Sequence, residues 1–255
     1  NEGKLNEDQL RTWCVNRMYY QKNIPVKDAI LLSKIPHRHI RQTWIQRILD
    51  HDGTPEQPGG IEQWLVMGEA MGLSREHDMI DENLLPGTKY AVDSYVNFVN
   101  EKPWFIGISS SLTELFAPKL HKTRLAAFEE HYTWIESAAL EYMRNRMTLA
   151  TRDCDHGLAV TLEYCNTPEL QREAVAAVQF KCNLLWSQLD ALYYHFATEW
   201  LYREFAFLPR WRIEDVMASA SHQNGNCGPH FDQYDVFLVQ LQGEKHWSLD
   251  DGNHV

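Results

Sequence analysis

Residues 178–192 read VQFKCNLLWSQLDAL, and this stretch decides the fold. Its apolar side chains recur every three or four residues, which is the spacing of one face of an α-helix. The apolar stripe is made by Val178, Leu184, Leu185, Leu189 and Leu192. Lys181 falls in the centre of that stripe. The segment therefore predicts a helix that packs against a core and carries a cation on its inner face.

The same helical spacing extends over the sequence from residue 4 to about residue 200, so an all-α body is predicted. Turn-forming residues interrupt it at 51–60, 85–87, 102–104 and 166–168. Thr167 is the expected N-cap of the last helix, with Pro168 at its first helical position.

The composition changes after about residue 200. Residues 236–241 are rich in β-branched and aromatic side chains and lie between turn-forming segments, which is typical of a strand. We therefore expect a helical bundle over residues 1–200 and a β-rich fragment over 201–255. The fragment is too short to close a sheet of its own.

Composition excludes several classes of partner. The 255 residues are 44% hydrophobic and carry a formal net charge of −11, which disfavours nucleic acids and anionic membranes. No apolar run approaches the roughly 20 residues that a membrane span needs, and no secretory signal is present. The five cysteines form no CxxC pair, which favours a reducing cytoplasmic location over a disulfide framework.

Three cations fall on the inward faces of three different helices. Arg17 lies among Leu10, Trp13, Cys14 and Tyr20, and Arg146 lies among Ala139, Met143, Met147 and Ala150. Lys181 is the third. An unpaired buried charge costs several kcal/mol, so each cation either reaches solvent, pairs with a carboxylate, or lines a polar cavity for an anionic ligand. Arginine suits a carboxylate ligand because its planar fork donates two parallel hydrogen bonds.

Other polar residues carry weaker signals. Arg47 and His51 lie four residues apart at the edge of their stripe. Glu114 and His121 share a face opposite Leu112, Phe116 and Leu120, with Arg124 nearby, and such a face is more often solvated than catalytic. Gln21 beside Arg17, and Tyr142 beside Arg146, are ordinary residues of amphipathic helices when taken alone.

Several long strings resemble the PqqC family, whose members complete the cofactor pyrroloquinoline quinone. They are residues 16–21 (NRMYYQ) with 24–28 (IPVKD), 44–53 (WIQRILDHDG), 110–118 (SSLTELFAP) with His121 and Arg124, Arg152-Asp153, 156–159 (HGLA) and 179–181 (QFK). The resemblance covers residues 5–198 in order. It implies a haem-oxygenase-like helical bundle that works as a homodimer.

The resemblance also implies an enzyme. Its substrate is a small polycarboxylate quinone precursor, and O2 oxidises this substrate with ring closure and release of hydrogen peroxide, without metal or flavin. The residues implied in substrate binding are Arg17, Tyr20, Gln21, Lys27, Arg47, Arg124 and Lys181. Those implied in proton handling and oxygen positioning are His51, Tyr95, Glu114, His121, Tyr142 and Arg146, the last also as a partner of substrate oxygens. A helical stretch with a site histidine precedes the position of Asn1 in the family, and the sequence lacks it.

The end of the sequence resembles a second family. Residues 208–215 (LPRWRIED) and 228–237 (GPHFDQYDVF) are similar to part of a JmjC-type oxygenase that uses Fe(II) and 2-oxoglutarate. There His230 and Asp232 would supply two arms of a facial triad. The third ligand is expected beyond residue 255, so we interpret the tail as an incomplete domain.

Three other functions remain open. Glu114, His121, Asp153 and His156 resemble part of the ligand set of a haem-oxygenase-like di-metal oxidase, but Leu149 and Tyr142 stand where further ligands are needed. A thiaminase-like relative would need a nucleophilic cysteine, and no cysteine stands in a matching context. The chain could also bind the quinone without catalysing a reaction.

Overall fold

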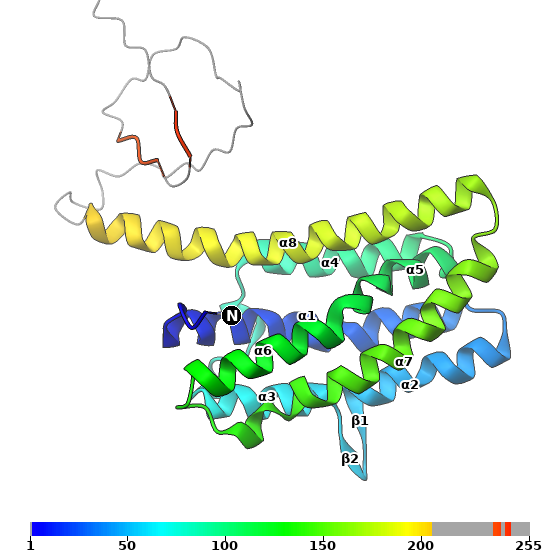
Figure 1. Ribbon diagram of the computed structural model, residues 1–255, viewed down its shortest axis with the longest axis horizontal. Coiled ribbons are helices and arrows are strands. Elements are labelled where there is room, and N and C mark those ends of the chain that lie inside the picture. Colours follow the sequence, from blue (N-terminus) through cyan, green and yellow to red (C-terminus); the bar gives the residue numbers. More distant parts are fainter. Residues whose placement is uncertain (1, 206–236, 241–242, 246–255) are drawn as a thin grey trace, which may run out of the picture. The chain divides into compact units, whose positions relative to one another are not determined.

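The described part of the chain is almost entirely helical, as predicted (Figure 1). The computed structural model describes residues 2–205, 237–240 and 243–245. The chain divides into two units, residues 1–207 and 208–255, and nearly all described residues belong to the first. Residues 237–240 belong to no helix or strand. The rest of the predicted β-rich segment, including His230 and Asp232, lies outside the described residues.

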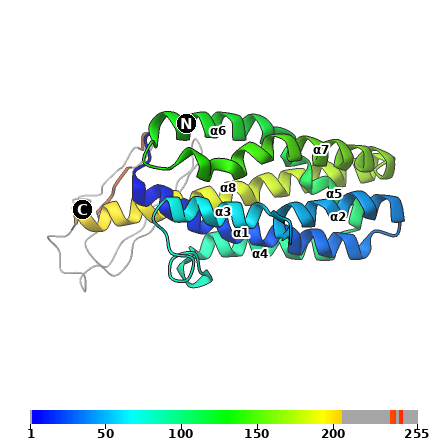
Figure 2. The ribbon, with the colours of Figure 1, turned by 90° about the horizontal axis from the view of Figure 1, so that it is seen from below.

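The helices run roughly parallel or antiparallel to one another (Figures 1 and 2). Helix α1 is central and packs against α2, α3 and α4, while α8 packs against α4 and α5 and α6 packs against α7. In chain order the elements are α1 (Glu7–Lys34), α2 (Arg38–Asp52), β1 (Gly53–Thr54), β2 (Gln57–Pro58), α3 (Gly60–Ala70), the 3-10 helix η1 (Asp81–Asn83), α4 (Pro86–Glu101), α5 (Trp104–Ser110), η2 (Ser111–Phe116), α6 (Ala117–His131), η3 (Ser137–Leu140), α7 (Glu141–Tyr164) and α8 (Pro168–Glu204). None of the described helices is long and apolar enough to cross a membrane.

Local sequence explains where several helices begin. Asn6 and Gln9 cap α1 reciprocally, because each side chain accepts a hydrogen bond from the backbone N–H of the other residue. Helix α8 begins at Pro168 as predicted, and the Thr167 hydroxyl accepts a hydrogen bond from the backbone N–H of Leu170 at 3.3 Å.

The break at residues 51–60 is a tight antiparallel hairpin in which Gly53 pairs with Pro58. Gly53 has φ +84°, a conformation that a side chain would strain. A Cβ on Gly59 would lie 2.3 Å from the backbone nitrogen of Gly53, so only glycine fits there. The hairpin therefore reverses the chain between α2 and α3 within a few residues.

Two large apolar clusters and a small one around Ile106 and Ala177 form the interior of the described part of the chain. The first joins α1, α3, α6 and the start of α7 around Trp64 and Met143. The second joins the remainder of α1 to α2, α4, α5, α7 and α8 around Trp44 and Val99. On α7, Arg146 and Asp153 lie in sequence between the contributions of that helix to the two clusters. Polar side chains thus occupy the middle of the bundle.

The inner face of α8 differs in part from the predicted stripe. Lys181 is 1% exposed, as expected for the centre of the buried face. The other buried residues of that face are Ala174, Ala177, Leu184 and Gln188, whereas Leu189 is 54% exposed. The prediction for Leu189 was therefore wrong. Hydrophobicity defines a wide stripe on a helix, and the helices packed against it decide which part of the stripe is covered.

Lys34 holds the junction between α1 and the end of α4. Its ammonium donates hydrogen bonds to the carbonyls of Val99 at 3.0 Å and Asn100 at 2.8 Å, and also to that of Lys102. These carbonyls have no partner within α4, because the last turn of a helix has no following N–H groups. We expect Lys34→Met to lower the free energy of unfolding by about 1–3 kcal/mol. Urea unfolding measures this loss, and the exposed Lys122→Met serves as the matched control. Equal stability of the two variants would contradict this role.

Candidate functional site

The middle of the bundle holds an unusual number of buried ions. Their exposed fractions are between 0% and 6%. They are Lys27, Asp28, Arg47, Arg146, Asp153 and Lys181. Charged side chains are almost never fully buried unless they are paired, because the interior does not solvate them. How each ion is compensated therefore shows what the site can bind.

Arg47 is compensated from three sides. Its Nη2 lies 2.7 Å from Glu114 Oε1, its Nη1 3.3 Å from Asp153 Oδ2, and its Nε 3.5 Å from Asp28 Oδ2. The guanidinium also lies 4.7 Å from the ring centroid of Trp44. Burial would lower the pKa of Arg47, but the three carboxylates raise it well above its ordinary value. Arg47 therefore stays charged at the centre of the cluster.

Arg146 and Lys27 share the same carboxylates. Arg146 lies 3.5 Å from Glu114 Oε2 and 3.6 Å from Asp153 Oδ2. Lys27 Nζ lies 2.6 Å from Asp28 Oδ1 and donates a hydrogen bond to the Ser111 hydroxyl at 3.1 Å. Three carboxylates and three cations thus form one half of the cluster.

The other half is cationic without compensation. Within the described part of the chain, Arg17, Arg124 and Lys181 form no ion pair with a carboxylate. Arg17 donates a hydrogen bond to the neutral amide oxygen of Gln188 at 3.3 Å and lies 3.8 Å from the ring centroid of Tyr20. Burial and the charge of Arg17 lower the pKa of Arg124 to about 10. This half would gain from an anion.

Lys181 lies between two aromatic rings. Its Nζ is 3.3 Å from the ring centroid of Tyr95 and 4.2 Å from that of Tyr20, and it has no hydrogen-bond partner among the described residues. Burial, followed by the charges of Arg17 and Lys27, lowers the pKa of Lys181 well below its ordinary value. An anion placed beside it would reverse that direction.

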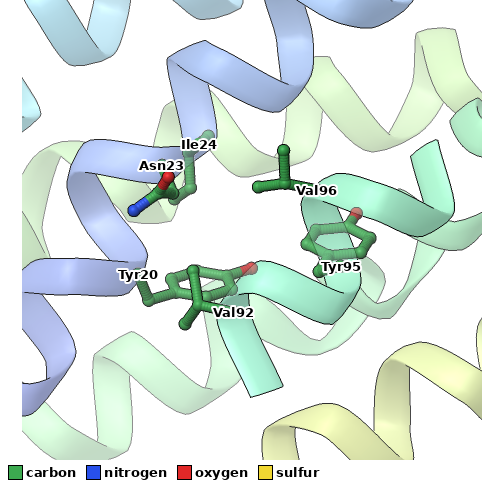
Figure 3. A pocket seen from close by; sticks show the side chains of 6 residues that line it. All are labelled: Tyr20, Asn23, Ile24, Val92, Tyr95 and Val96. Carbon is green, nitrogen blue, oxygen red and sulfur yellow. The ribbon is translucent and has the colours of Figure 1, made fainter. Parts of the chain in front are cut away.

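Figure 3 shows the two tyrosines among the residues that line a small cleft between α1 and α4. The remaining lining residues are Asn23, Ile24, Val92 and Val96. None of the lining side chains is charged, so this cleft is not the place where an anion would bind. It marks the wall that Tyr20 and Tyr95 form beside Lys181.

His51 is held as a neutral base. Its Nδ1 lies 2.9 Å from the backbone oxygen of Arg47, and a carbonyl can only accept, so Nδ1 carries the proton. Its Nε2 is buried and has no partner within the described residues, so its lone pair is available. Burial, then the charge of Arg146, lowers the pKa of His51 to about 4. The imidazole is therefore neutral at physiological pH.

His121 and Tyr142 face one another with ring centroids 5.8 Å apart. Burial, then the charges of Arg124 and Arg146, lowers the pKa of His121 to about 3. The Tyr142 hydroxyl donates a hydrogen bond to Gln21 Oε1 at 2.8 Å. A Cβ on Gly60 would lie 3.1 Å from the Tyr142 ring, so the glycine at the start of α3 makes room for that ring.

The structure brings all the residues predicted for the bundle site into one connected cluster. They come from α1, α2, α4, η2, α6, α7 and α8. Their individual catalytic and binding roles stay predictions. The pKa of Glu114 argues against its predicted role in proton handling. Burial would raise its pKa, but Arg47, Arg146 and Lys27 hold the pKa of Glu114 well below its usual range. It is a permanent carboxylate that bridges two arginines.

The solvated interpretation of the Glu114–His121 face was wrong. Phe116 is 75% exposed and Leu120 is 45% exposed, whereas the Glu114 side chain is only 18% exposed. The Glu114 side chain points inward, whereas the side chains of Phe116 and Leu120 point outward. The reason is that η2 and the start of α6 cover an ionic cluster, whereas Phe128 near the end of α6 packs in the first apolar cluster.

The donor set does not suit a di-metal centre. No group of three or more histidine, cysteine, aspartate or glutamate side chains within the described ranges could hold a metal ion. Glu114 and Asp153, which resemble ligands of that class, both contact Arg47 and Arg146. The guanidiniums already neutralise these two carboxylates, and their positive charge disfavours a metal ion beside them.

Sequence reasoning missed several residues of the cluster. Asp28, Ser111 and Gln188 contact predicted site residues directly. Asp153 was considered only as a metal ligand. Two signals in the sequence could have revealed Asp153 and Asp28. Asp153 follows Arg146 by seven residues, which is two helical turns on the same face, and Asp28 is adjacent to Lys27.

A long-helix bundle around a buried ionic cluster defines the structural class of the chain. It is similar to a solved domain of unknown function with a haem-oxygenase-like fold from Shewanella denitrificans. The TM-score is 0.61 at 13% sequence identity, covering 77% of this chain and 82% of that chain. This likeness confirms the haem-oxygenase-like fold and carries no further argument.

The chain belongs to the TENA/THI-4/PQQC family, whose sequence pattern matches residues 1–191. It is 51% identical over 191 residues to a pyrroloquinoline-quinone synthase of Pseudomonas aeruginosa strain PAO1, covering 75% of this chain and 76% of the relative. It is 50% identical over 192 residues to the synthase of Cronobacter sakazakii, with the same coverage. The pattern of a JmjC domain matches residues 200–254. Both predicted resemblances are confirmed.

The depressed pKa of His51 predicts a measurable pH dependence of stability. Its folded value of about 4 lies below the ordinary 6.5, so the contribution of His51 is fully present above pH 6.5 and is lost as pH falls toward 4. The gap corresponds to roughly 3 kcal/mol. We expect the fall in the free energy of unfolding between pH 6.5 and 4.5 to be smaller in His51→Gln than in the parent chain. Urea titrations at several pH values test this.

The exposed His77→Gln is the control for His51 and should keep the slope of the parent chain. Part of the acid sensitivity will remain in His51→Gln, because His121 titrates in the same direction. Identical slopes in all three proteins would contradict the assignment of a buried neutral imidazole at position 51.

Proposed function

We propose that this chain catalyses the last step in the synthesis of pyrroloquinoline quinone. In that step O2 oxidises a small, ring-open polycarboxylate precursor with ring closure, and each O2 takes up two electrons and two protons to leave as hydrogen peroxide. The observation that carries the proposal is the uncompensated cationic half of the cluster, beside two neutral imidazoles. Relatives named pyrroloquinoline-quinone synthase, about half identical to the chain, support it.

Charge complementarity supports a polycarboxylate substrate. Burial, and then the positive charge of Arg17, lowers the pKa of both Arg124 and Lys181. Carboxylates of the substrate would supply the missing negative charge, and each guanidinium can hold one through two parallel hydrogen bonds. Away from water such pairs are strong, so several carboxylates on one small molecule would bind tightly and in one orientation.

Three groups that face the interior would transfer protons, namely the side chains of His51, His121 and Tyr142. The free lone pair of His51 Nε2 can accept a proton from the substrate during ring closure. A bound polyanion would raise the depressed pKa of both histidines toward neutrality, where an imidazole exchanges protons efficiently. His121 and the hydroxyl of Tyr142 would then supply protons to the reduced oxygen. Glu114 stays ionised and holds Arg47 and Arg146 in place.

We further propose that the reaction needs neither metal nor flavin and that the chain has no nucleic-acid or membrane partner. The described cysteines Cys14, Cys154, Cys165 and Cys182 are free thiols, which supports work in the reducing cytoplasm.

The direct test is turnover. The purified full chain, stripped of metal with a chelator, is mixed with the ring-open precursor in air, and quinone absorbance and hydrogen peroxide are followed. We expect both products without added metal. Binding of the finished quinone without turnover would overturn the catalytic proposal and identify a quinone-binding protein. Turnover only after addition of iron or manganese would favour the metal-dependent alternative.

Arg124 offers a sharper test of the anion site, because its loss should affect binding and stability in opposite directions. We expect Arg124→Gln to weaken binding of pyrroloquinoline quinone by about 10-fold or more, since one charge-assisted contact is lost. The empty variant should unfold at a higher temperature, because a repulsive buried charge is removed. Fluorescence titration and thermal unfolding measure the two effects.

Arg172→Gln is the matched control for Arg124→Gln. Arg172 is exposed on α8 and pairs only with Glu169 within the described residues, so its loss should change neither quantity. If Arg124→Gln binds the quinone as tightly as the control does, the cationic half is not the binding site for its carboxylates.

We also propose that the chain forms a homodimer. The outer face of α8 exposes apolar side chains at helical spacing, with Trp186 67%, Leu189 54% and Tyr193 55% exposed. Contiguous exposed apolar side chains of this kind are typical of a protein interface. Sedimentation velocity should give a dimer for the parent chain and a monomer for Trp186→Glu. A parent chain that sediments as a monomer at all concentrations would contradict the proposal.

A further inference from the structure

Asp153 has no role in the proposed chemistry, yet it is the most connected carboxylate of the cluster. It lies on α7, and its side chain is 2% exposed. One oxygen, Oδ2, lies 3.3 Å from Arg47 Nη1 and 3.6 Å from Arg146 Nη1. A single carboxylate oxygen therefore lies against both guanidiniums, which would otherwise repel each other across the cluster.

The other oxygen of Asp153 faces the protein surface. Oδ1 accepts hydrogen bonds from Arg152 Nη2 at 2.7 Å and Arg152 Nε at 3.2 Å. Arg152 is 41% exposed and also pairs with Asp50 on α2. The Asp153 carboxylate is thus held from outside by Arg152, and Arg152 is held by a neighbouring helix. Oδ1 is therefore fixed by hydrogen bonds, whereas Oδ2 lies at ion-pair distance from two guanidiniums and forms no hydrogen bond among the described residues.

Glu114 shares part of this function from another element. Glu114 accepts hydrogen bonds from Arg47 at 2.7 Å and Arg146 at 3.5 Å, but it lies on the short 3-10 helix η2 and not on the helix that carries Arg146. Asp28 contacts Arg47 but forms no ion pair with Arg146 among the described residues. Asp153 lies two helical turns after Arg146 on α7, so helix geometry itself sets the distance between them.

We propose that Asp153 is a positioning residue of the site, which fixes the guanidiniums of Arg47 and Arg146 in the geometry that turnover requires. The inference rests on the proposed function, because Arg146 acts on the substrate only if the cluster is the active site. Rates depend strongly on such placement, and a displacement of about 1 Å can cost roughly 100-fold.

A positioning role and a purely structural role of Asp153 predict different effects of removing its charge. Asp153→Asn keeps the shape of the side chain and removes one negative charge, so the site becomes more cationic. Binding of a polyanion should stay equal or become tighter, whereas the guanidiniums lose a fixed partner and turnover falls. A purely structural role would weaken both properties together.

The experiment compares the full-length parent chain with Asp153→Asn and Asp155→Asn. Asp155 is exposed on the same helix, so its substitution controls for the loss of a carboxylate from α7. We expect kcat for quinone formation to fall at least 10-fold in Asp153→Asn, while the Kd for pyrroloquinoline quinone does not rise. Asp155→Asn should match the parent chain in both. Unchanged kcat in Asp153→Asn, or parallel loss of kcat and binding, would overturn the proposal.

A second measurement is independent of turnover and separates this inference from the proposed function. The Nε–H signals of Arg47 and Arg146 in ¹⁵N-arginine-labelled protein, assigned with Arg47→Lys and Arg146→Lys, report the mobility of both guanidiniums. They should broaden or shift in Asp153→Asn and not in Asp155→Asn. If the parent chain makes no quinone, the proposed function fails, and unchanged signals would still reject the positioning role.

Should Asp153→Asn not fold, Asp153→Glu is the second variant. It keeps the charge and displaces the carboxylate, and kcat should again fall with binding retained.

Discussion

Arg47 is a full positive charge inside a helical bundle, and the surrounding structure is arranged to solvate it. Three carboxylates meet it from three different elements: Asp28 on α1, Glu114 on η2 and Asp153 on α7. Removing one partner from a buried ion costs about 3–5 kcal/mol, so each of these elements is held in register by the same group. The inward direction of the Glu114 side chain follows from this constraint.

The cations of one half of the cluster use all of its carboxylates, and this leaves the cations of the other half without ion-pair partners among the described residues. Because Glu114, Asp28 and Asp153 are committed to Arg47, Arg146 and Lys27, no described carboxylate remains for the other cations. A protein tolerates such an excess of buried charge only if the folded state is stable enough to bear it, and functional sites are where that is observed. The resemblance assigns all these cations to the substrate, whereas the geometry divides them into a structural set and a set that can accept a ligand.

Much of the fold was predictable because its signals are local. The start of α8 at Pro168 follows from Thr167 and Pro168 alone, and the hairpin at residues 53–58 lies inside a predicted break. The inner face of α8 was predicted at Lys181 and wrongly at Leu189. Periodicity gives the direction of a stripe only within the width of the hydrophobic surface, and the partner helices select the covered part.

The sequence by itself determined the helical body, its breaks, the family, and the three cations on inward faces, since helical spacing and long matched strings depend on neighbours along the chain. Only the tertiary structure decided which cations are compensated. Asp153 and Arg47 are far apart in sequence, and Glu114 belongs to a face that reads as solvent-exposed. An ion pair depends on distances of a few ångströms between separate helices, and those distances exist only once the helices have packed.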